Sequence, residues 1–476
     1  MTTSRRDFLR ASACTLGGLA LGSTFESLGL VSAYAQAAPD YRALVCVFLN
    51  GGNDGNNMVV PLDAEFGQYS SVRGPSTLAL AQSSLVPVNP PSQGRQYGLH
   101  PNLAPEVATP AVAFKGLLDV WNQGKLAVVC NVGPLVEPLT RTTYLNGTGR
   151  KPLQLFSHSD QISQWQSAVA NAVSRTGWGG RLADKAAALN GAATFPQVVT
   201  IAGVSLFVTG ANALPLAIND SNSTLGSSLP LTMTANSSGS STPTDVPTRR
   251  AAFDALRTLD GGALLVKADA DTRTSALRTK AQLDAAPNTD FAKIPNTTLG
   301  RQLEQVARLV ALRDTLGVRR QIFFCLLGGF DTHSNQRTGS GQDGLLLQLG
   351  QALRGFWETL GDLGVQDNVT TFTLSDFGRT FQASGSGTGV GTDHGWGSHH
   401  LVMGGAVRGG NFYGTYPTLA LGGPDDADTR GRWIPTTSVE QYAATLASWY
   451  GLSAADFPAV FPLLNRFPVS NLGFMS

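Results

Sequence analysis

The sequence has few charged residues, few cysteines and almost no net charge. Only 14% of its 476 residues are charged, and the formal net charge is +1 at pH 7. Proteins that bind nucleic acid or an acidic membrane surface by electrostatic attraction carry a basic excess, so we expect neither partner here. The chain is instead rich in hydrophobic residues (42%) and in glycine (54 residues). This composition is typical of a tightly turned globular protein with a large core.

The four cysteines do not form the pattern of a disulfide framework or of a thiolate metal site. Cys14 lies near the N-terminus, and Cys46, Cys130 and Cys325 each lie inside an apolar, strand-like segment. Three is an odd number, and no Cys-x-x-Cys sequence occurs. We therefore expect these three cysteines to be buried as small hydrophobic residues.

The first 37 residues have the character of a targeting segment. Residues 4–10, Ser-Arg-Arg-Asp-Phe-Leu-Arg, resemble the twin-arginine export signal, and small-residue cleavage sites follow at Ala35 and Ala37. The apolar region between them is too weak for a membrane-spanning helix. The resemblance implies export by the Tat translocase and a periplasmic or secreted protein without a stable membrane span. This route carries folded proteins, often loaded with metal or cofactor.

Apolar segments without alternation are separated by helical segments along the rest of the chain. Buried parallel strands give such segments, and their alternation with helices is typical of α/β proteins. We predict one α/β domain at residues 38–476, with a doubly wound, largely parallel sheet between helix layers. A Ser/Thr/Asn-rich stretch near 219–248 should form an exposed excursion. The predicted strands are 43–49, 126–130, one or two within 195–211, 321–327, 369–374 and 401–403, and the predicted helices are 110–123, 249–285, 299–316, 345–360 and 438–450.

Three predicted strands are each followed, within five residues, by an aspartate. Asn53 and Asp54 follow the first strand, Asp331 and His333 follow the strand 321–327, and Asp376 follows the strand 369–374. Because the carboxyl ends of parallel strands meet at one edge of a sheet, we expect these side chains to lie close together. Ordinary turn chemistry remains an alternative for the Gly- and Asn-rich segment after the first strand.

Three of the six histidines lie just beyond Asp376, in the segment that begins with Asp393 and His394 and ends with His399 and His400. Carboxylates and imidazoles gathered at one edge would repel one another or be desolvated unless a cation joined them. Mixed oxygen and nitrogen ligands suit zinc or manganese better than calcium. We predict one or two divalent ions, with candidate ligands Asp54, Asp331, His333, Asp376, Asp393, His394 and His399. A loop of satisfied polar residues is the alternative.

A second chemical segment lies at residues 155–161, where Ser157 and His158 precede a predicted helix. A serine at this position can cap the helix. A hydroxyl at a helix N-terminus beside an imidazole can also attack an anionic ester, so Ser157 and His158 are candidate catalytic residues. We expect Asn53 and Arg379 to bind the anionic group, although Arg379 could instead pair with an acid.

Five motifs, together with the N-terminal signal, resemble a known bacterial family. They are Gly-Gly-Asn-Asp-Gly at 51–55, Ser-His-Ser-Asp-Gln at 157–161, Gly-Gly-Phe-Asp-Thr-His at 328–333, Ser-Asp-Phe-Gly-Arg-Thr at 375–380 and Asp-His-Gly-Trp-Gly at 393–397. The sequence is identified as a member of domain-of-unknown-function family 1501, which resembles the alkaline phosphatase and sulfatase superfamily. The resemblance covers essentially the whole mature chain and implies an alkaline-phosphatase-like fold.

The superfamily resemblance also implies roles for individual residues. Asp54 would bind one metal ion, Asp331 and His333 a second, and Ser157 would be the nucleophile. The sequence departs from the superfamily pattern in three places. Asp331 and His333 are closer than in the usual Asp-x-x-x-His, Phe377 stands where a metal-binding histidine would follow Asp376, and the late Asp-His pair follows a glycine-rich insert.

Two functions of different classes fit these features. The first is a periplasmic, metal-dependent hydrolase of phosphate or sulfate esters, which would take a small anionic ester and attack it with Ser157 or a metal-activated water. The second is a catalytically inactive relative that acts as an exported binding or assembly factor. A serine esterase with an oxyanion site at residues 51–54 fits less well, because no Asp-x-x-His pair closes the chain.

Overall fold

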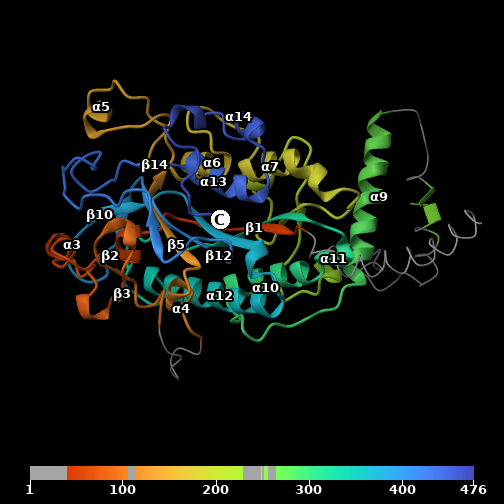
Figure 1. Ribbon diagram of the computed structural model, residues 1–476, viewed down its shortest axis with the longest axis horizontal. Coiled ribbons are helices and arrows are strands. Elements are labelled where there is room, and N and C mark those ends of the chain that lie inside the picture. Colours follow the sequence, from red (N-terminus) through yellow and green to blue (C-terminus); the bar gives the residue numbers. More distant parts are fainter. Residues whose placement is uncertain (1–39, 106–113, 229–247, 249–250, 253, 256–263) are drawn as a thin grey trace, which may run out of the picture. The chain divides into compact units, whose positions relative to one another are not determined.

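The computed structural model describes residues 40–105, 114–228, 248, 251–252, 254–255 and 264–476 (Figure 1). The twin-arginine segment at 1–37, most of the predicted excursion and the start of the predicted helix 110–123 lie outside the described residues. Every element below lies within the compact unit Arg42–Ser476. Among the described residues, no helix is both long and apolar enough to cross a membrane.

Within this part of the chain, nine strands form one sheet, in the order β13-β5-β12-β9-β1-β8-β6-β7, with β14 also paired to β5. The strand β12 runs antiparallel to β5 and β9, and the other pairings in the sheet are parallel. The predicted α/β class and largely parallel sheet are therefore confirmed. The strands are β1 (Arg42–Leu49), β5 (Leu126–Gly133), β6 (Val198–Thr200), β7 (Leu216–Ala217), β8 (Arg320–Leu327), β9 (Val369–Ser375), β12 (Ser398–Gly404), β13 (Asn411–Tyr413) and β14 (Thr437–Ser438).

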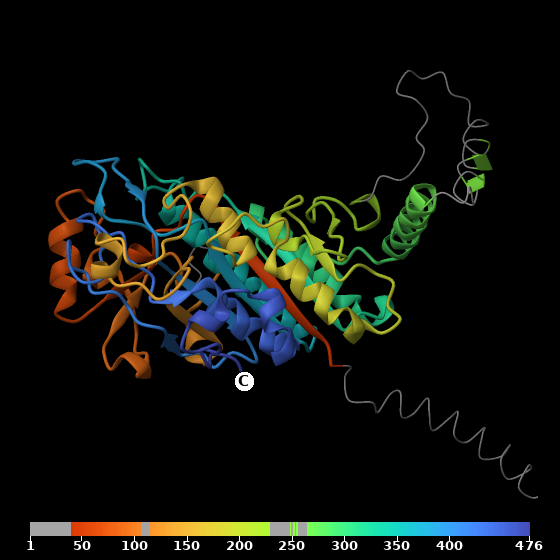
Figure 2. The same ribbon diagram turned by 90° about the horizontal axis from the view of Figure 1, so that it is seen from above.

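Helices cover both faces of this sheet (Figure 1), and Figure 2 shows β1, in red, running through the middle of the layers. One face carries α6 (His158–Ser167), α7 (Trp178–Ala186), α13 (Val439–Tyr450) and α14 (Phe457–Val460). The other carries α4 (Leu118–Asn122), α10 (Thr298–Ala311), α11 (Arg313–Leu316) and α12 (Gln342–Asp362). Further helices in the described part of the chain are α2 (Gly55–Met58), α3 (Glu65–Arg73), α5 (Arg141–Leu145) and α9 (Leu264–Asp284).

Two small sheets flank the large one. One joins β2 (Val59–Pro61), β3 (Val86–Val88) and β4 (Tyr97–Leu99), and the other pairs β10 (Arg379–Ala383) with β11 (Thr392–His394). Short 3-10 helices occupy Gln82–Ser84, Pro91–Gln93, Ala187–Asn190, Leu206–Val208, Gly226–Ser228, Gln366–Asn368, Ala454–Asp456 and Leu464–Arg466.

The core on the α6 side of the sheet explains the non-alternating strands. Alternate residues of β1, such as Phe48, pack in one cluster with Trp165, Trp178 and Tyr442 from three covering helices. The opposite face of each strand is covered by the second helix layer, so both faces must be apolar. The three described cysteines are buried and free of disulfides, as expected. Burial raises the pKa of Cys46 well above its usual value.

Several predicted boundaries differ from the structure. The segment 195–211 contains one strand, β6, which agrees with the predicted one or two, and the chain then turns at Gly203 and continues as a 3-10 helix that buries Phe207. The helix predicted at 299–316 is divided into α10 and α11 at Leu312, whose backbone leaves the helical region (φ −90°, ψ 0°). The last helix begins at the predicted capping box, in which Ser438 and Gln441 bond reciprocally, and it ends at Gly451.

Glu440, in the first turn of α13, is a buried acid that should make the folded state less stable as the pH rises from 4.5 to 8. It is 1% exposed, and its Oε1 atom has no hydrogen-bond partner among the described residues. Burial raises its pKa from 4.5 to about 8. The unfolded chain therefore loses this proton first as the pH rises, so the folded state loses stability between pH 4.5 and 8.

We expect Glu440→Gln to be more stable than the wild type at pH 8.5 by about 2–4 kcal/mol, because one pKa unit corresponds to about 1.4 kcal/mol. At pH 4.5 both proteins carry a neutral side chain here, so the difference should nearly vanish. Urea denaturation of the wild type and the variant at pH 8.5 and at pH 4.5 measures the two differences in unfolding free energy. An equal difference at both pH values would contradict a buried, neutral Glu440.

Candidate metal centre

Three neighbouring parallel strands deliver the candidate residues to one edge of the sheet. Leu49 of β1 aligns with Leu327 of β8 and with Ser375 of β9, so the three strands end level. The segments that follow remain paired, since the Asn50 amide donates to the Leu327 carbonyl (2.9 Å). The predicted meeting of these strand ends is therefore observed.

Gly51 joins two of these strand ends directly. Its amide donates to Asp376 Oδ1 at 2.9 Å. Its φ of +117° lies where residues with a side chain are strained, and an added Cβ would come within 2.3 Å of the Asp331 nitrogen. Glycine at this position therefore lets the backbone approach closely enough to place both acids at the same edge.

Three imidazoles converge on Asp331. His158 begins α6, His333 follows β8 and His394 ends β11. The Nε2 atoms of these histidines lie 3.6, 3.1 and 3.7 Å, respectively, from Asp331 Oδ1. His333 Nε2 is 3.0 Å from His394 Nε2. We call these four residues the imidazole cluster. His158, Asp331 and His394 offer ligand atoms that all lie within 4.8 Å of one another.

The other ring nitrogen of each histidine is held by an acceptor outside the cluster. A backbone carbonyl can only accept, so His394 carries its proton on Nδ1 and presents a lone pair at Nε2. Metal-binding histidines have this arrangement, in which the second nitrogen donates to a carboxylate or carbonyl. The three contacts are His158 Nδ1 to Asp376 Oδ2 (2.7 Å), His333 Nδ1 to Asp393 Oδ1 (3.2 Å) and His394 Nδ1 to the Phe156 carbonyl (2.7 Å).

These contacts fit a cation at the centre of the cluster. The Nε2 atoms of His333 and His394 lie 3.0 Å apart, and His394 turns a lone pair toward His333. A proton could relieve this, but desolvation lowers the pKa of His394, and the nearby His158 and Arg379 lower it further. A metal ion would accept the His394 lone pair in place of a proton and would be bound by neutral imidazoles.

The surrounding acids differ in the direction in which their pKa is shifted. Partial burial raises the pKa of Asp331, but the hydrogen bond and charge of Arg379 outweigh it and hold the pKa below its usual value. Burial likewise raises the pKa of Asp393, and Arg430, at 2.6 Å, reverses the effect. Burial dominates at Asp376 and raises its pKa despite the hydrogen bonds that it accepts. Asp331 and Asp393 are therefore ionised at neutral pH.

The two residues predicted to bind an anion are engaged by protein groups. The guanidinium of Arg379 is buried, donates to Asp331 Oδ1 (2.7 Å) and the Gly51 carbonyl (3.2 Å), and contacts Thr392. Asn53 is fully buried, and its Oδ1 accepts from the Gln342 amide at 3.2 Å. Arg379 thus follows the alternative expected for it, pairing with an acid.

Ser157 occupies the N-cap position of α6 without a side-chain capping bond. Its hydroxyl donates to Asp160 Oδ2 at 2.6 Å. The two ring nitrogens of His158 face Asp376 and Asp331 instead, so no imidazole is placed to accept the proton of Ser157.

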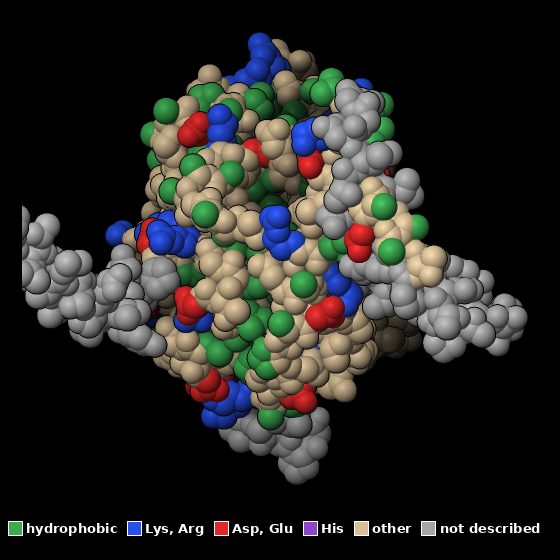
Figure 3. Space-filling model, turned by 90° about the vertical axis from the view of Figure 1, so that its right-hand side faces the viewer, with side chains coloured by type: hydrophobic (Ala, Val, Ile, Leu, Met, Phe, Trp, Pro, Cys, Tyr) green, Lys and Arg blue, Asp and Glu red, His purple; other side chains and the backbone are tan. Residues whose placement is uncertain are grey.

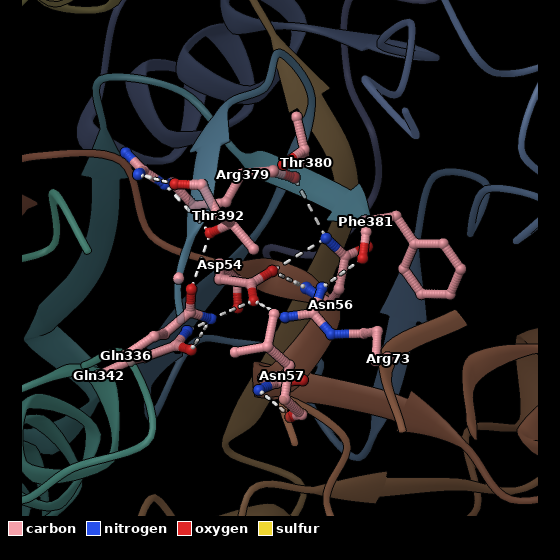
Figure 4. A network of polar contacts seen from close by, with 12 residues as sticks. Asp54, Asn56, Asn57, Arg73, Gln336, Gln342, Arg379, Thr380, Phe381 and Thr392 are labelled. Carbon is pink, nitrogen blue, oxygen red and sulfur yellow. Dashed lines mark hydrogen bonds and ion pairs between the residues drawn. The ribbon is translucent and has the colours of Figure 1, made fainter. Parts of the chain in front are cut away.

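Asp54 lies in a separate buried network rather than in the imidazole cluster (Figure 4). Its Oδ2 pairs with the Arg73 guanidinium and accepts from the Gln336 amide at 2.6 Å. Its Oδ1 accepts from the backbone and side-chain nitrogens of Asn56 at 3.1 and 2.9 Å. Both partners of the ion pair are fully buried. The positive charge beside Asp54, which was predicted to be a metal ion, is therefore the guanidinium of Arg73.

His399 also lies apart from the cluster. It is 2% exposed, its Nδ1 accepts from the Asn131 amide at 3.2 Å, and its ring stacks on Tyr416. Burial lowers the pKa of His399 to about 4, so the ring is neutral. His399 contacts Asn131 and Tyr416, which lie outside the cluster.

Sequence reasoning did not find two groups that complete the site. The Phe156 carbonyl faces His394 because this aromatic residue adopts a φ of +71°, unusual for a bulky side chain. Arg430 pairs with Asp393 from a loop far along the chain. Neither has a local sequence signal, since a carbonyl belongs to every residue and Arg430 lies in no motif.

Comparisons with known proteins give weak structural likenesses and one family. The sulfatase PsFucS1 from Pseudoalteromonas sp. is 10% identical, with a TM-score of 0.28 over 94% of this chain and 72% of that chain. The alkaline phosphatase from the Antarctic bacterium TAB5 is 11% identical, with a TM-score of 0.25 over 89% of this chain and 99% of that chain. No curated protein matches the sequence. The family described as "Protein of unknown function (DUF1501)" matches residues 41–427, and the chain belongs to this family.

Proposed function

We propose that this protein is a metal-dependent hydrolase of phosphate or sulfate esters that acts in the periplasm after export by the twin-arginine route. The observation that carries the proposal is the convergence of three histidine Nε2 atoms on Asp331. The Nδ1 atom of each of these histidines contacts a carboxylate or a carbonyl oxygen outside the cluster. The export signal at residues 4–10 supports the location. The substrate would be a small anionic ester.

A divalent cation, when bound, acidifies a water molecule and neutralises negative charge that develops on a transferred phosphoryl or sulfuryl group. The protein residues prepare this site. Asp376, Asp393 and the Phe156 carbonyl hold the imidazoles in the orientation that points their lone pairs inward. Arg379 keeps Asp331 ionised and fixed.

Water is the better candidate than Ser157 for the attacking group. The Ser157 hydroxyl is bonded to Asp160, and no imidazole lies ready to remove its proton. In hydrolysis by water, the water oxygen bonds to phosphorus or sulfur, the ester bond to the alcohol oxygen breaks, and the alcohol leaves with a proton. The products are the alcohol and phosphate or sulfate.

The alternative is an exported binding or assembly factor that keeps the metal but has no turnover. The engagement of Arg379, Asn53 and Ser157 by protein groups favours it, because these are the side chains expected to hold or attack an anion.

The test is the metal content of protein exported through its own signal, measured together with turnover of aryl phosphate monoesters, diesters and aryl sulfate. Bound metal and turnover that a chelator removes would support the hydrolase. Bound metal without turnover on any ester would favour the binding factor. Protein without metal and without turnover would overturn the hydrolase.

A further inference from the structure

We propose that the imidazole cluster binds a single ion of the zinc class, and that Asp376 and Asp393 are positioning residues rather than ligands. The ligands would be the three Nε2 atoms and Asp331. This inference rests on the proposed function and deepens it, because it fixes the number of ions, the class of metal and the residues that touch it.

The separations within the cluster suit four donors around one small ion. Zinc–nitrogen bonds of about 2.0–2.1 Å in a tetrahedron place neighbouring donors about 3.3 Å apart. The separations from the Nε2 atom of His333 are 3.0 Å to His394 Nε2 and 3.1 Å to Asp331 Oδ1. His158 and His394 lie 3.6 and 3.7 Å from the same oxygen. His158, Asp331 and His394 offer ligand atoms that all lie within 4.8 Å of one another, and His333 approaches this group through Asp331 and His394.

Asp376 and Asp393 each face the second ring nitrogen of a histidine in the cluster. Asp376 is 1% exposed and accepts from the Gly51 amide with Oδ1 and from His158 with Oδ2. Asp393 contacts His333 with Oδ1 and Arg430 with Oδ2. Asp376 would therefore act on a metal through His158, and Asp393 through His333.

A second ion has no place at Asp54. Both oxygens of Asp54 already accept hydrogen bonds, and the Arg73 guanidinium pairs with Oδ2 in a fully buried contact. A metal ion there would lie beside the buried Arg73 guanidinium, whose positive charge would repel it. The ligand set also selects the metal, since three imidazoles and one carboxylate suit zinc, whereas manganese, magnesium and calcium prefer oxygen.

The experiment loads metal-free protein with zinc or cobalt, counts the ions by elemental analysis, and records the visible spectrum of the cobalt form, which reports coordination number without turnover. We expect one ion per chain and a four-coordinate cobalt spectrum. His394→Ala should lose the ion. Asp376→Asn should keep one four-coordinate ion bound about 10–100-fold more weakly, because second-sphere partners of metal-binding histidines have effects of this size.

Two further variants keep the test decisive. Asp393→Asn replaces a more exposed acid (29% exposed) and serves where Asp376→Asn does not fold. Asp160→Asn, beside the cluster in the same helix as His158, is the matched control and should bind the ion with unchanged affinity. An acid variant that loses the ion as completely as His394→Ala would overturn the positioning role.

The ion count separates this inference from the proposed function. Two ions per chain with turnover would overturn the single site and leave the hydrolase standing. One four-coordinate ion without turnover would support the site and overturn the hydrolase. A six-coordinate cobalt spectrum would overturn the zinc-class assignment. No bound ion would overturn both proposals.

Discussion

Replacing His394 with alanine is expected to lower ester turnover by about 1,000-fold or more. The metal supplies several kcal/mol of transition-state stabilisation, and each 1.4 kcal/mol corresponds to about tenfold in rate. His394 is central because its Nε2 lies close to both His333 and Asp331, and its ring stacks on Phe377. Steady-state rates on the ester that the wild type hydrolyses fastest measure the loss.

Chemical rescue provides the control for this variant. The His394 side chain is 25% exposed, so free imidazole can enter the space that alanine leaves. Added imidazole should restore part of the turnover of His394→Ala and have no effect on the wild type. His333→Ala should also lose turnover and be rescued by imidazole, because it removes the Nε2 atom that faces His394 Nε2. A variant with normal turnover would exclude the imidazole cluster as the reaction centre.

Replacing Asp54 with asparagine is expected to destabilise the fold by about 3–5 kcal/mol, the usual cost of breaking a buried ion pair. The remaining Arg73 guanidinium is fully buried, and the asparagine amide would turn N–H groups toward the donors of Arg73 and Gln336. Urea denaturation of the purified variant measures the loss. Reduced turnover in this variant would therefore report lost folding and would not identify a metal ligand.

The double variant Asp54→Asn/Arg73→Met tests this explanation. Removing both charges leaves no buried ion without a partner, so the double variant should be more stable than the sum of the single effects predicts. Simple additivity of the two changes would contradict the role of Arg73 as the counterion. Loss of the bound ion from a well-folded Asp54→Asn protein would restore Asp54 as a metal ligand.

The sequence by itself determined the α/β class and the residues of the central strands. The segments at 43–49, 321–327 and 369–374 were predicted as buried strands, and the structure has strands there. It also placed Asp331, His333, Asp376, Asp393 and His394 in one region, because parallel strands end at the same edge.

Only the tertiary structure decided which of these groups face one another. Asp54 and Asp331 both follow a buried strand within five residues, yet Arg73, from a helix that follows β1 and β2, pairs with Asp54. Asp376 and Asp393 were predicted as metal ligands, and in the structure one oxygen of each faces His158 or His333. Direction and spacing of side chains depend on how separate segments pack. Local sequence therefore gave the chemical groups of the site, and long-range contacts decided which lie in the cluster and which support it.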